Sequence, residues 1–392
     1  MDTDTDIQSK ALQCHLCLSN NVILFDSFAN IDRAASDCKP WPKGGKLCIC
    51  TACCTVQKVI DSSWRAEVSE IYANYELYHQ ATDEREQPVF NSITGTSTPR
   101  SVAVLEYAQQ VVGLKSDSKV IDIGCGVGNM LKSLSRMLTT AELYGFEPNV
   151  HKKQVLEQIE NVAGIYTEMS QLKNIQFDLL TMIHVLEHID SPMQVLEKLK
   201  NNITPDGYLL IAVPDYTTNP FDLIITDHAS HFSLETLHNL LLNSGLEVID
   251  ISNTIINKEI VAVCKVPAQA RQSAATMIRP IYNQDLVQKQ LDWMRTIIDN
   301  ARDTAESNRP FGIFGTSIAA NWMYGALSDV VDYFVDEDQD RVDKLYHQKP
   351  VYSASKIPNG SHTYVCLQPN VVGNVMKRFS SSGYCLYATP DF

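Results

Sequence analysis

The feature that most constrains the fold of this chain is residues 119–130, where an apolar strand, a glycine-rich turn and the start of a helix follow one another. Three glycines, Gly124, Gly126 and Gly128, occupy alternate positions of the turn. Glycine adopts positive φ without strain and lets a ligand lie directly against the backbone, and the first N–H groups of a helix have no partner inside it. The stretch therefore predicts an α/β domain that binds a polar ligand at this turn.

A second apolar run, residues 143–146, ends in Glu147. A carboxylate at the tip of the second strand accepts hydrogen bonds from a ribose diol in nucleotide-binding α/β folds. The turn lacks the G-x-G-x-x-G spacing typical of dinucleotide sites, and an acid, Asp122, lies inside the first strand. Strand, turn and acid resemble those of class I S-adenosylmethionine-dependent methyltransferases. The resemblance implies that S-adenosylmethionine is bound by Asp122, Gly124, Gly126, Gly128 and Glu147.

Strands and helices alternate in the rest of the central region, with strands expected at residues 162–166, 177–183 and 208–213. This alternation predicts a doubly wound, mostly parallel sheet, in which ligands bind beyond the carboxyl ends of the strands. His184 ends the fourth strand and is therefore a candidate cofactor-binding residue. Glu168 follows the third strand, where an acidic side chain in this fold often holds the adenine amino group. A solvated loop acid is an equally good interpretation of Glu168.

Helical patterns elsewhere predict a tyrosine-bearing helix over residues 68–80 and a helix over residues 151–160. Aromatic side chains at helical spacing usually form a packing face. His188 precedes a further helix, and we expect it to cap that helix or to pack against it.

The N-terminal segment is rich in cysteine and contains two C-x-x-C pairs, Cys14 with Cys17 and Cys50 with Cys53. In a reducing compartment two such pairs are typical of a tetrahedral zinc site. Four protein ligands leave no open coordination position, so the predicted Zn²⁺ is structural. In so small a segment the metal supplies much of the folding free energy. Cys48 is a competing ligand, and a set of buried free cysteines is the alternative interpretation.

Charge and hydropathy limit the partners of the chain. It has 392 residues and a net charge of −14, without a lysine and arginine cluster for a phosphate backbone, so we expect no nucleic-acid partner. No apolar run approaches the roughly 18 residues of a membrane span, and the first residues lack the basic and apolar regions of a signal peptide. We therefore expect no membrane partner and a cytoplasmic location, where thiols stay reduced.

A loop late in the central region holds Asp227, His228 and His231 within five residues. A carboxylate beside an imidazole orients it and raises its basicity. With the cysteine-rich segment and the central core, this loop makes nearly the whole chain similar to the nucleotide-linked deoxysugar C-methyltransferases. The resemblance implies that His228 is the general base and that Asp227 is its acid partner. It also implies two further active-site residues, His184 and Tyr78.

Members of that family act on a small-molecule acceptor, a 4-keto sugar nucleotide, by removing a proton beside its carbonyl group and methylating the enolate carbon. Two departures leave the acceptor open: residues 223–226 contain no tyrosine, and Ala319 stands where the family often has lysine. Methylation of oxygen or nitrogen in another small metabolite is therefore an alternative. A zinc-dependent interaction protein without catalysis is a third possibility.

Three domains are predicted: a zinc-binding domain over residues 1–85, an S-adenosylmethionine-binding core over residues 86–267 and a Rossmann-like domain over residues 268–392. The last is indicated by a strand and glycine turn that end at Gly315, without the first G-x-G of a dinucleotide motif. Shaping the acceptor pocket is the role that we expect for this third domain.

Overall fold

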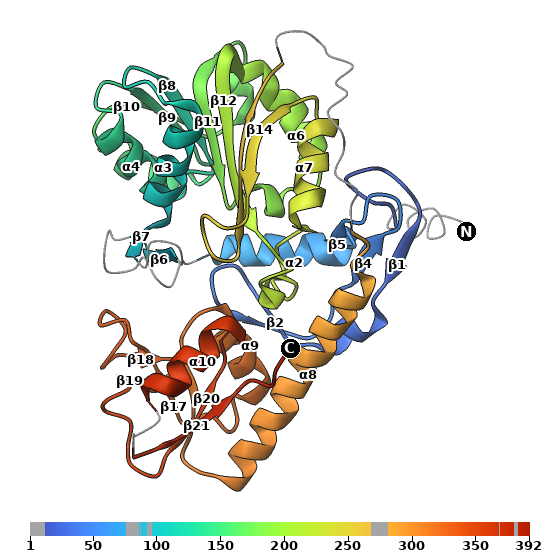
Figure 1. Cartoon of the computed structure of the whole chain (residues 1–392), viewed down its shortest axis with the longest axis vertical. Helices are drawn as coiled ribbons and strands as arrows, with labels where there is room; N and C mark the ends of the chain where they lie inside the picture. Colours follow the sequence, from blue (N-terminus) through green and yellow to red (C-terminus); the bar gives the residue numbers. More distant parts are fainter. Residues whose placement is uncertain are drawn as a thin grey trace.

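The computed structural model describes residues 12–75, 86, 88–91, 96–267, 281–367, 369–379 and 383–392. Two stacked halves make up the molecule, and the N-terminal segment lies along their boundary (Figure 1). The upper half in that view holds a seven-stranded sheet, and the lower half holds a six-stranded sheet. Tyr78, predicted to lie in the active site, is outside the described residues.

The strands of the upper sheet are, in order across it, β10 (Val162–Tyr166), β9 (Glu142–Phe146), β8 (Lys119–Ile123), β11 (Phe177–Ile183), β12 (Ile203–Pro214), β15 (Glu259–Lys265) and β14 (Glu247–Ser252). The first five run parallel, and β15 is antiparallel to both of its neighbours. This arrangement confirms the predicted doubly wound α/β sheet of the class I methyltransferase fold. The apolar runs of the central strands are buried because both faces of the sheet are covered by helices.

The helices of the upper half are α3 (Arg100–Val112), α4 (Asn129–Met137), α5 (Lys153–Leu156), α6 (Pro192–Leu199) and α7 (Leu234–Asn243). α3 and α4 pack against one face of the sheet, and α6 and α7 pack against the other. Short 3₁₀ turns connect these elements: η2 (Val150–Lys152), η3 (Met169–Leu172), η4 (Leu186–His188), η5 (Lys200–Asn202) and η6 (Pro220–Asp222). The helix predicted over residues 151–160 is wrong in length, because α5 has only four residues. Only Leu156 of α5 is buried, and so small a buried apolar surface does not stabilise a longer helix against the sheet.

The N-terminal segment folds as short strands around the cysteine pairs. β1 (Val22–Leu24), β4 (Leu47–Cys50) and β5 (Val56–Lys58) form an antiparallel sheet, and its fourth strand, β13 (Ser230–His231), comes from the upper half. β2 (Arg33–Ala34) pairs with β3 (Pro40–Trp41), and the 3₁₀ turn η1 (Asp26–Asn30) precedes them.

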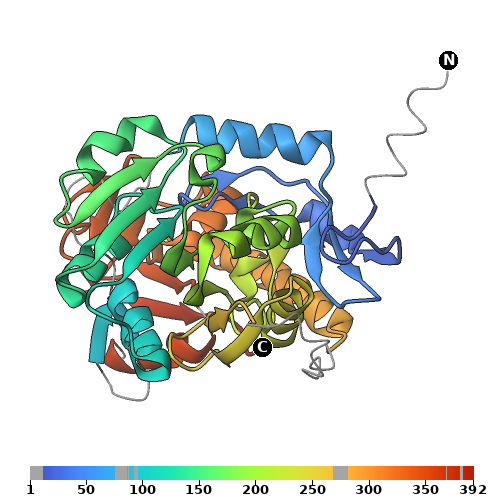
Figure 2. The same ribbon diagram turned by 90° about the horizontal axis from the view of Figure 1, so that it is seen from above.

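α2 (Ser62–Ala73) follows this segment and runs along an outer edge of the molecule when seen from above (Figure 2). It begins earlier than the helix predicted over residues 68–80, because the side chain of Asp61 caps it by accepting a hydrogen bond from Trp64 N at 2.9 Å. A hairpin of β6 (Pro88–Asn91) and β7 (Thr96–Pro99) then leads to α3.

The lower half begins with the long helix α8 (Gln284–Ser307). Its strands are, in order across the sheet, β18 (Leu345–Tyr346), β19 (Lys349–Tyr352), β17 (Tyr333–Val335), β16 (Phe311–Phe314), β20 (His362–Val365) and β21 (Cys385–Ala388). Only β18 is antiparallel to its neighbour among the described strands of this sheet. α9 (Ile318–Leu327) and α10 (Pro369–Arg378) complete a second, smaller Rossmann-like unit.

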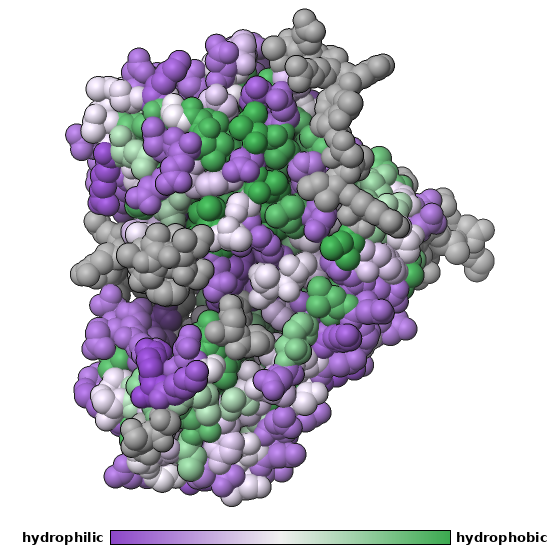
Figure 3. All heavy atoms as spheres, viewed as in Figure 1, coloured by the Kyte–Doolittle hydropathy of each residue, from purple (hydrophilic) through white to green (hydrophobic). Residues whose placement is uncertain are grey.

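One hydrophobic cluster joins all three parts of the chain. It contains Phe28 and Ile49 of the N-terminal segment, Phe221 and Leu223 of the loop after β12, and Trp322 of α9. On the face seen in Figure 3, the surface is hollowed between the two halves. Within the described residues, no helix combines the length and the apolar character needed to cross a membrane.

Candidate active site

The glycine turn joins β8 to α4, and all three glycines have positive φ: 71° at Gly124, 57° at Gly126 and 83° at Gly128. A Cβ at Gly124 would lie 2.6 Å from Val185, and one at Gly128 would lie 2.5 Å from Ile159. A Cβ at Gly126 would meet no atom of the described residues nearer than 3.9 Å. The open space above Gly126 fits a ligand that lies against the backbone.

Two carboxylates flank the turn. Asp122 is buried on β8, and its Oδ1 accepts a hydrogen bond from Thr181 Oγ1 at 2.6 Å. Burial raises the pKa of Asp122 to about 7. Glu147 follows β9, and its Oε2 accepts a hydrogen bond from Gly126 N at 2.9 Å. Each carboxylate oxygen has two lone pairs, so Glu147 keeps acceptor capacity for ribose hydroxyl groups, and the turn with Glu147 fits a nucleoside.

Glu168 lies exposed after β10, at the N-cap of η3. Its side chain and that of Gln171 form a capping box with the backbone of this turn. The carboxylate therefore has a local structural role, and the contact of Glu168 with adenine stays a prediction.

His184 follows β11 with a φ of 54°, a left-handed conformation that is uncommon outside glycine. Its Nδ1 lies 3.3 Å from Glu187 Oε1, and its Nε2 lies 3.0 Å from Glu259 Oε2. Burial alone lowers the pKa of His184, but Glu259 and Glu187 raise it to about 9, so the ring is charged at neutral pH. Since both ring nitrogens lie within ion-pair distance of carboxylates, His184 would act on a bound molecule through its charge.

His228 is buried in the loop between β12 and α7, and its carboxylate partner is Asp222, not the adjacent Asp227. His228 Nδ1 lies 2.8 Å from Asp222 Oδ1. With Nδ1–H donated to Asp222, the lone pair is on Nε2, which is the tautomer that a general base needs. The structure thus corrects the predicted Asp227–His228 pair: the partner of the His228 ring is Asp222, which lies in the turn η6.

Asp227 is turned toward the N-terminal segment, which is why it does not orient His228. Its Oδ1 accepts a hydrogen bond from Ser36 N at 2.9 Å, and its Oδ2 accepts one from Ser36 Oγ at 2.5 Å. Asp227 Oδ2 also lies 3.3 Å from His188 Nδ1, and that nitrogen lies 3.2 Å from Tyr72 Oη. The His188 ring meets the His228 ring edge-on, with centroids 4.6 Å apart. His188 therefore belongs to the site, where sequence reasoning placed only a capping or packing residue.

Asp222, Glu187 and Glu259 are buried carboxylates of the site that sequence reasoning missed. Asp222 is a lone acid in the apolar run Pro-Phe-Asp-Leu-Ile, and Glu187 stands between Val-Leu and His-Ile. A buried carboxylate needs a partner. An acid among apolar residues could therefore have been predicted to belong to a buried polar site. Ser36 gave no signal, because its partner Asp227 is remote in sequence.

The two cysteine pairs come together as predicted. Cys14 Sγ lies 3.6 Å from Cys53 Sγ, and Cys17 Sγ lies 3.5 Å from Cys50 Sγ. Sulfurs bound at about 2.3 Å to a tetrahedral zinc ion lie about 3.8 Å apart, so the four thiols fit Zn²⁺. The ligand group does not include Cys48, which is buried on β4.

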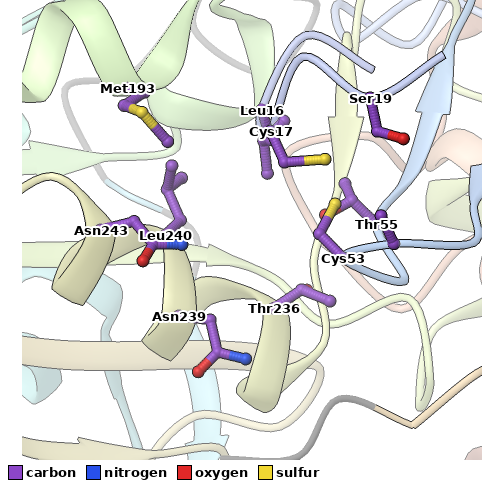
Figure 4. Close-up of a pocket in the computed structure, with 11 residues that line it drawn as sticks. Leu16, Cys17, Ser19, Cys53, Thr55, Met193, Thr236, Asn239, Leu240 and Asn243 are labelled. Atoms are coloured by element: carbon purple, nitrogen blue, oxygen red, sulfur yellow. The ribbon is translucent and has the colours of Figure 1, made fainter. Parts of the chain in front are cut away.

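A hollow of about 330 Å³ lies beside these thiols (Figure 4). Cys17 and Cys53 are the two partly exposed members of the cluster, and both belong to its wall. Met193 of α6 and Leu240 of α7 lie across from them. The cysteine cluster is thus packed next to the helices that cover one face of the upper sheet.

Comparison with known proteins identifies the upper half. Residues 101–251 match the family model described as a methyltransferase domain. The matched region runs from α3 to β14 and contains the glycine turn, Glu147, His184 and His228. Fold and match together define a class I methyltransferase domain within this chain.

Two curated relatives are similar to part of the chain. The ubiquinone biosynthesis O-methyltransferase of Actinobacillus pleuropneumoniae serotype 5b (strain L20) is 25% identical over 138 residues, which are 31% of this chain and 56% of that protein. The enzyme of the same name from Yersinia enterocolitica serotype O:8 / biotype 1B is 26% identical over 157 residues, 36% of this chain and 64% of that protein. The chain thus spans less than two thirds of the length of each of these relatives.

Among solved structures, the plantazolicin methyltransferase BpumL is 14% identical to this chain, with a TM-score of 0.41. The match covers 52% of this chain and 95% of BpumL.

Proposed function

We propose that this protein is an S-adenosylmethionine-dependent methyltransferase that acts on a small acceptor. The observation that carries the proposal is the methyltransferase-domain match over residues 101–251. The backbone at Gly126 would hold the nucleoside, and Glu147 would accept hydrogen bonds from its ribose hydroxyl groups. When bound, S-adenosylmethionine supplies an electrophilic methyl group, and the protein has to place a nucleophile in line with it.

For the acceptor we propose a nucleotide-linked 4-keto deoxysugar that is methylated on carbon. Carbon beside a carbonyl group becomes a nucleophile only when a proton is removed, and a positioned base contributes about 10²–10⁴-fold to such a step. His228 is the proposed base, because its Nδ1–H is donated to Asp222 and Nε2 is left to take the proton. The electron pair of the broken C–H bond would then form the new bond to the methyl carbon, while the bond from that carbon to sulfur breaks and its electrons leave with the neutral thioether.

The negative charge that develops on the carbonyl oxygen of the acceptor needs a positive neighbour. His184 is the proposed source, since Glu259 and Glu187 keep its ring protonated at neutral pH. Tyr78 is proposed as a further hydrogen-bond donor on the resemblance alone. For the N-terminal segment we propose one structural Zn²⁺ bound by Cys14, Cys17, Cys50 and Cys53.

The second candidate function is methylation of an oxygen atom. It is favoured by the names of the two curated relatives, which are O-methyltransferases. The same His228 would then remove the proton of a hydroxyl group.

The deciding experiment is transfer of a ¹³C-labelled methyl group from S-adenosylmethionine to a panel of 4-keto sugar nucleotides in deuterated water. The proposal expects a product whose ¹³C methyl group is bonded to carbon in the NMR spectrum. It also expects wash-in of deuterium beside the ketone when S-adenosylhomocysteine replaces the methyl donor. A methyl signal bonded to oxygen would favour the second candidate. Failure to bind S-adenosylmethionine at millimolar concentration in calorimetry would refute both.

The variant His228→Asn tests the proposed base. We expect kcat to fall by about 10²–10⁴-fold, because no other group takes over the proton. The affinity for S-adenosylmethionine, measured by calorimetry, should stay within about twofold of the wild type, since the hydrogen bond of His228 is made to Asp222 and not to the glycine turn. Full activity in this variant would remove His228 from the mechanism.

A further inference from the structure

The loop that carries His228 is built largely by the N-terminal segment. β13, the strand directly after His228, pairs with β5 of that segment. Trp64 Nε1 donates a hydrogen bond to Thr226 O at 2.9 Å, and His15 Nε2 lies 2.8 Å from Ser230 Oγ. The proposed base therefore takes its position from residues that lie far away in the sequence.

Lys58, the last residue of β5, is buried inside this loop. Its Nζ lies 2.7 Å from Leu223 O, 3.1 Å from Ile225 O and 2.8 Å from His231 Nε2. An ammonium group has three N–H donors, so Lys58 satisfies one acceptor with each. Burying a lysine side chain costs free energy unless its polar end is hydrogen-bonded. The three acceptors around Nζ show that the loop folds around this side chain.

A continuous set of contacts connects Lys58 with His228. The carboxylate of Asp222 can only accept a hydrogen bond, so the proton of His231 is on Nδ1 and His231 Nε2 accepts from Lys58 Nζ. His231 Nδ1 lies 2.7 Å from Asp222 Oδ2, and His228 Nδ1 lies 2.8 Å from Asp222 Oδ1. Burial lowers the pKa of His231 to about 4, so the ring is neutral and Asp222 receives one hydrogen bond from each histidine.

We infer that Lys58 and His231 are positioning residues for His228. Lys58 bonds Nε2 of His231 and so supports its Nδ1–H tautomer, His231 holds one oxygen of Asp222, and the other oxygen of Asp222 orients His228 for proton removal by Nε2. This inference rests on the proposed function of His228 as the base. It assigns to the zinc-bearing segment a part in catalysis that does not involve contact with either substrate.

The state of the histidines can be measured without any acceptor. In protein labelled with ¹⁵N-histidine, long-range ¹H–¹⁵N spectra distinguish the two neutral tautomers, and His→Asn variants assign the signals. We expect His228 and His231 of the wild type both to be protonated on Nδ1. In Lys58→Met, His231 Nε2 loses the donor that it faces, so we expect its ¹⁵N signal to shift and the share of the Nδ1–H tautomer to fall. Wild-type His231 protonated on Nε2 would overturn the inference.

Activity provides the second arm, with the 4-keto-6-deoxysugar of thymidine diphosphate as the probe acceptor. We expect Lys58→Met and His231→Leu each to lower kcat by about 10–100-fold, as a misplaced base does, and to leave the affinity for S-adenosylmethionine unchanged. His231→Asn should restore kcat to within about threefold, because its amide N–H replaces the donor to Asp222. The control is Lys46→Met, since Lys46 lies on the surface of the same segment and pairs with Asp61.

Each outcome decides either the positioning role of Lys58 and His231 or the proposed function. Equal losses in His231→Leu and His231→Asn, or an unchanged kcat in Lys58→Met, would refute the positioning role. If Lys58→Met does not fold, as shown by loss of S-adenosylmethionine binding, the two His231 variants decide. If the wild type neither methylates the probe nor exchanges its proton, the proposed function fails, while the tautomers still test the chain from Lys58 to His228.

Discussion

A single carboxylate, Asp222, holds two histidines of the candidate site. Burial alone would raise its pKa, but His231 and His228 keep the pKa of Asp222 well below its ordinary range. The side chain is therefore an anion in the interior, with a histidine on each oxygen. Removing one partner of such a buried, charged group is costly, so the geometry of His228 depends on Asp222 more than on its neighbour in sequence.

Asp222→Asn tests this dependence, with Asp227→Asn as its matched control. An amide at position 222 can donate to His228 Nδ1 and so favours the wrong tautomer of the base; we expect kcat to fall by about 10³–10⁴-fold. Asp227→Asn should cost less than about tenfold, because Ser36 and His188 are its partners rather than His228. Steady-state kinetics on the same probe acceptor checks both, and a larger loss in Asp227→Asn would restore the original assignment of the acid.

The ion pair of His184 and Glu259 should appear in the pH dependence of stability. Burial alone lowers the pKa of His184, but Glu259 and Glu187 together raise it from 6.5 to about 9. Their interaction with the charged ring therefore stabilises the fold fully below about pH 6.5, and this contribution is lost as pH rises through about 9. Between these values, we expect the free-energy difference between the wild type and Glu259→Gln to shrink by on the order of 1–3 kcal/mol. Urea unfolding at a series of pH values measures it.

The control for this pH experiment is Glu247→Gln, whose carboxylate faces Lys265 on the surface. Its difference from the wild type should not vary over the same pH range, because this pair contains no histidine. A stability difference for Glu259→Gln that is independent of pH would contradict the assigned charge of His184.

Elements formed by contiguous residues were predictable from the sequence. β8, the glycine turn and α4 are consecutive in the sequence. The spacing of Gly124, Gly126 and Gly128 was therefore enough to predict a strand, a turn and a helix in this order. The spacing of the two C-x-x-C pairs likewise predicted that their four thiols form one cluster, as they do in the structure. Elements that depend on remote partners were not predictable in this way: β13 is only two residues long and forms because β5 lies beside it.

The same reasoning explains which parts of the site were found. His184 and Glu147 sit at the ends of strands whose order could be predicted. The partner of His228 was assigned from adjacency in the sequence, but a turn brings Asp222 to the ring and Ser36 takes Asp227. Contacts between side chains on different elements therefore had to come from the structure.

At the scale of elements, Cys50→Ala tests whether the four-cysteine cluster, rather than the other cysteines, binds the proposed zinc ion. We expect its metal content to fall from about one equivalent of zinc to less than half, because three ligands no longer complete a tetrahedral site. Since Cys50 ends β4, which pairs with β5, kcat should also fall, through the strand that carries Lys58. Elemental analysis and kinetics measure both.

The matched control for this experiment is Cys48→Ala on the same strand. Cys48 is buried, but it is not part of the ligand group, so this variant should retain its zinc. Loss of zinc from Cys48→Ala, or full retention in Cys50→Ala, would contradict the assigned ligands.

At the scale of the whole molecule, the shared hydrophobic cluster makes the three parts of the chain interdependent. Phe221 directly precedes Asp222, and its ring contacts both Trp293 of α8 and Trp322 of α9, with centroids 5.6 Å apart in each pair. The lower half therefore supports the turn that carries Asp222 of the candidate active site. This support was not visible in the sequence, because no motif connects residue 221 with residue 322.

Trp322→Ala tests this connection. Trp322 is fully buried, so we expect a loss of about 3–5 kcal/mol in the free energy of unfolding. The unfolding should remain a single calorimetric transition, because a core shared by both halves couples their folding. Trp322→Phe keeps an aromatic ring against Phe221 and should lose less than half as much. kcat should follow the same order, since the cavity left by alanine frees the turn beside Asp222. Two separate transitions in the wild type, or an alanine variant with unchanged kcat, would mean that the halves fold and act independently.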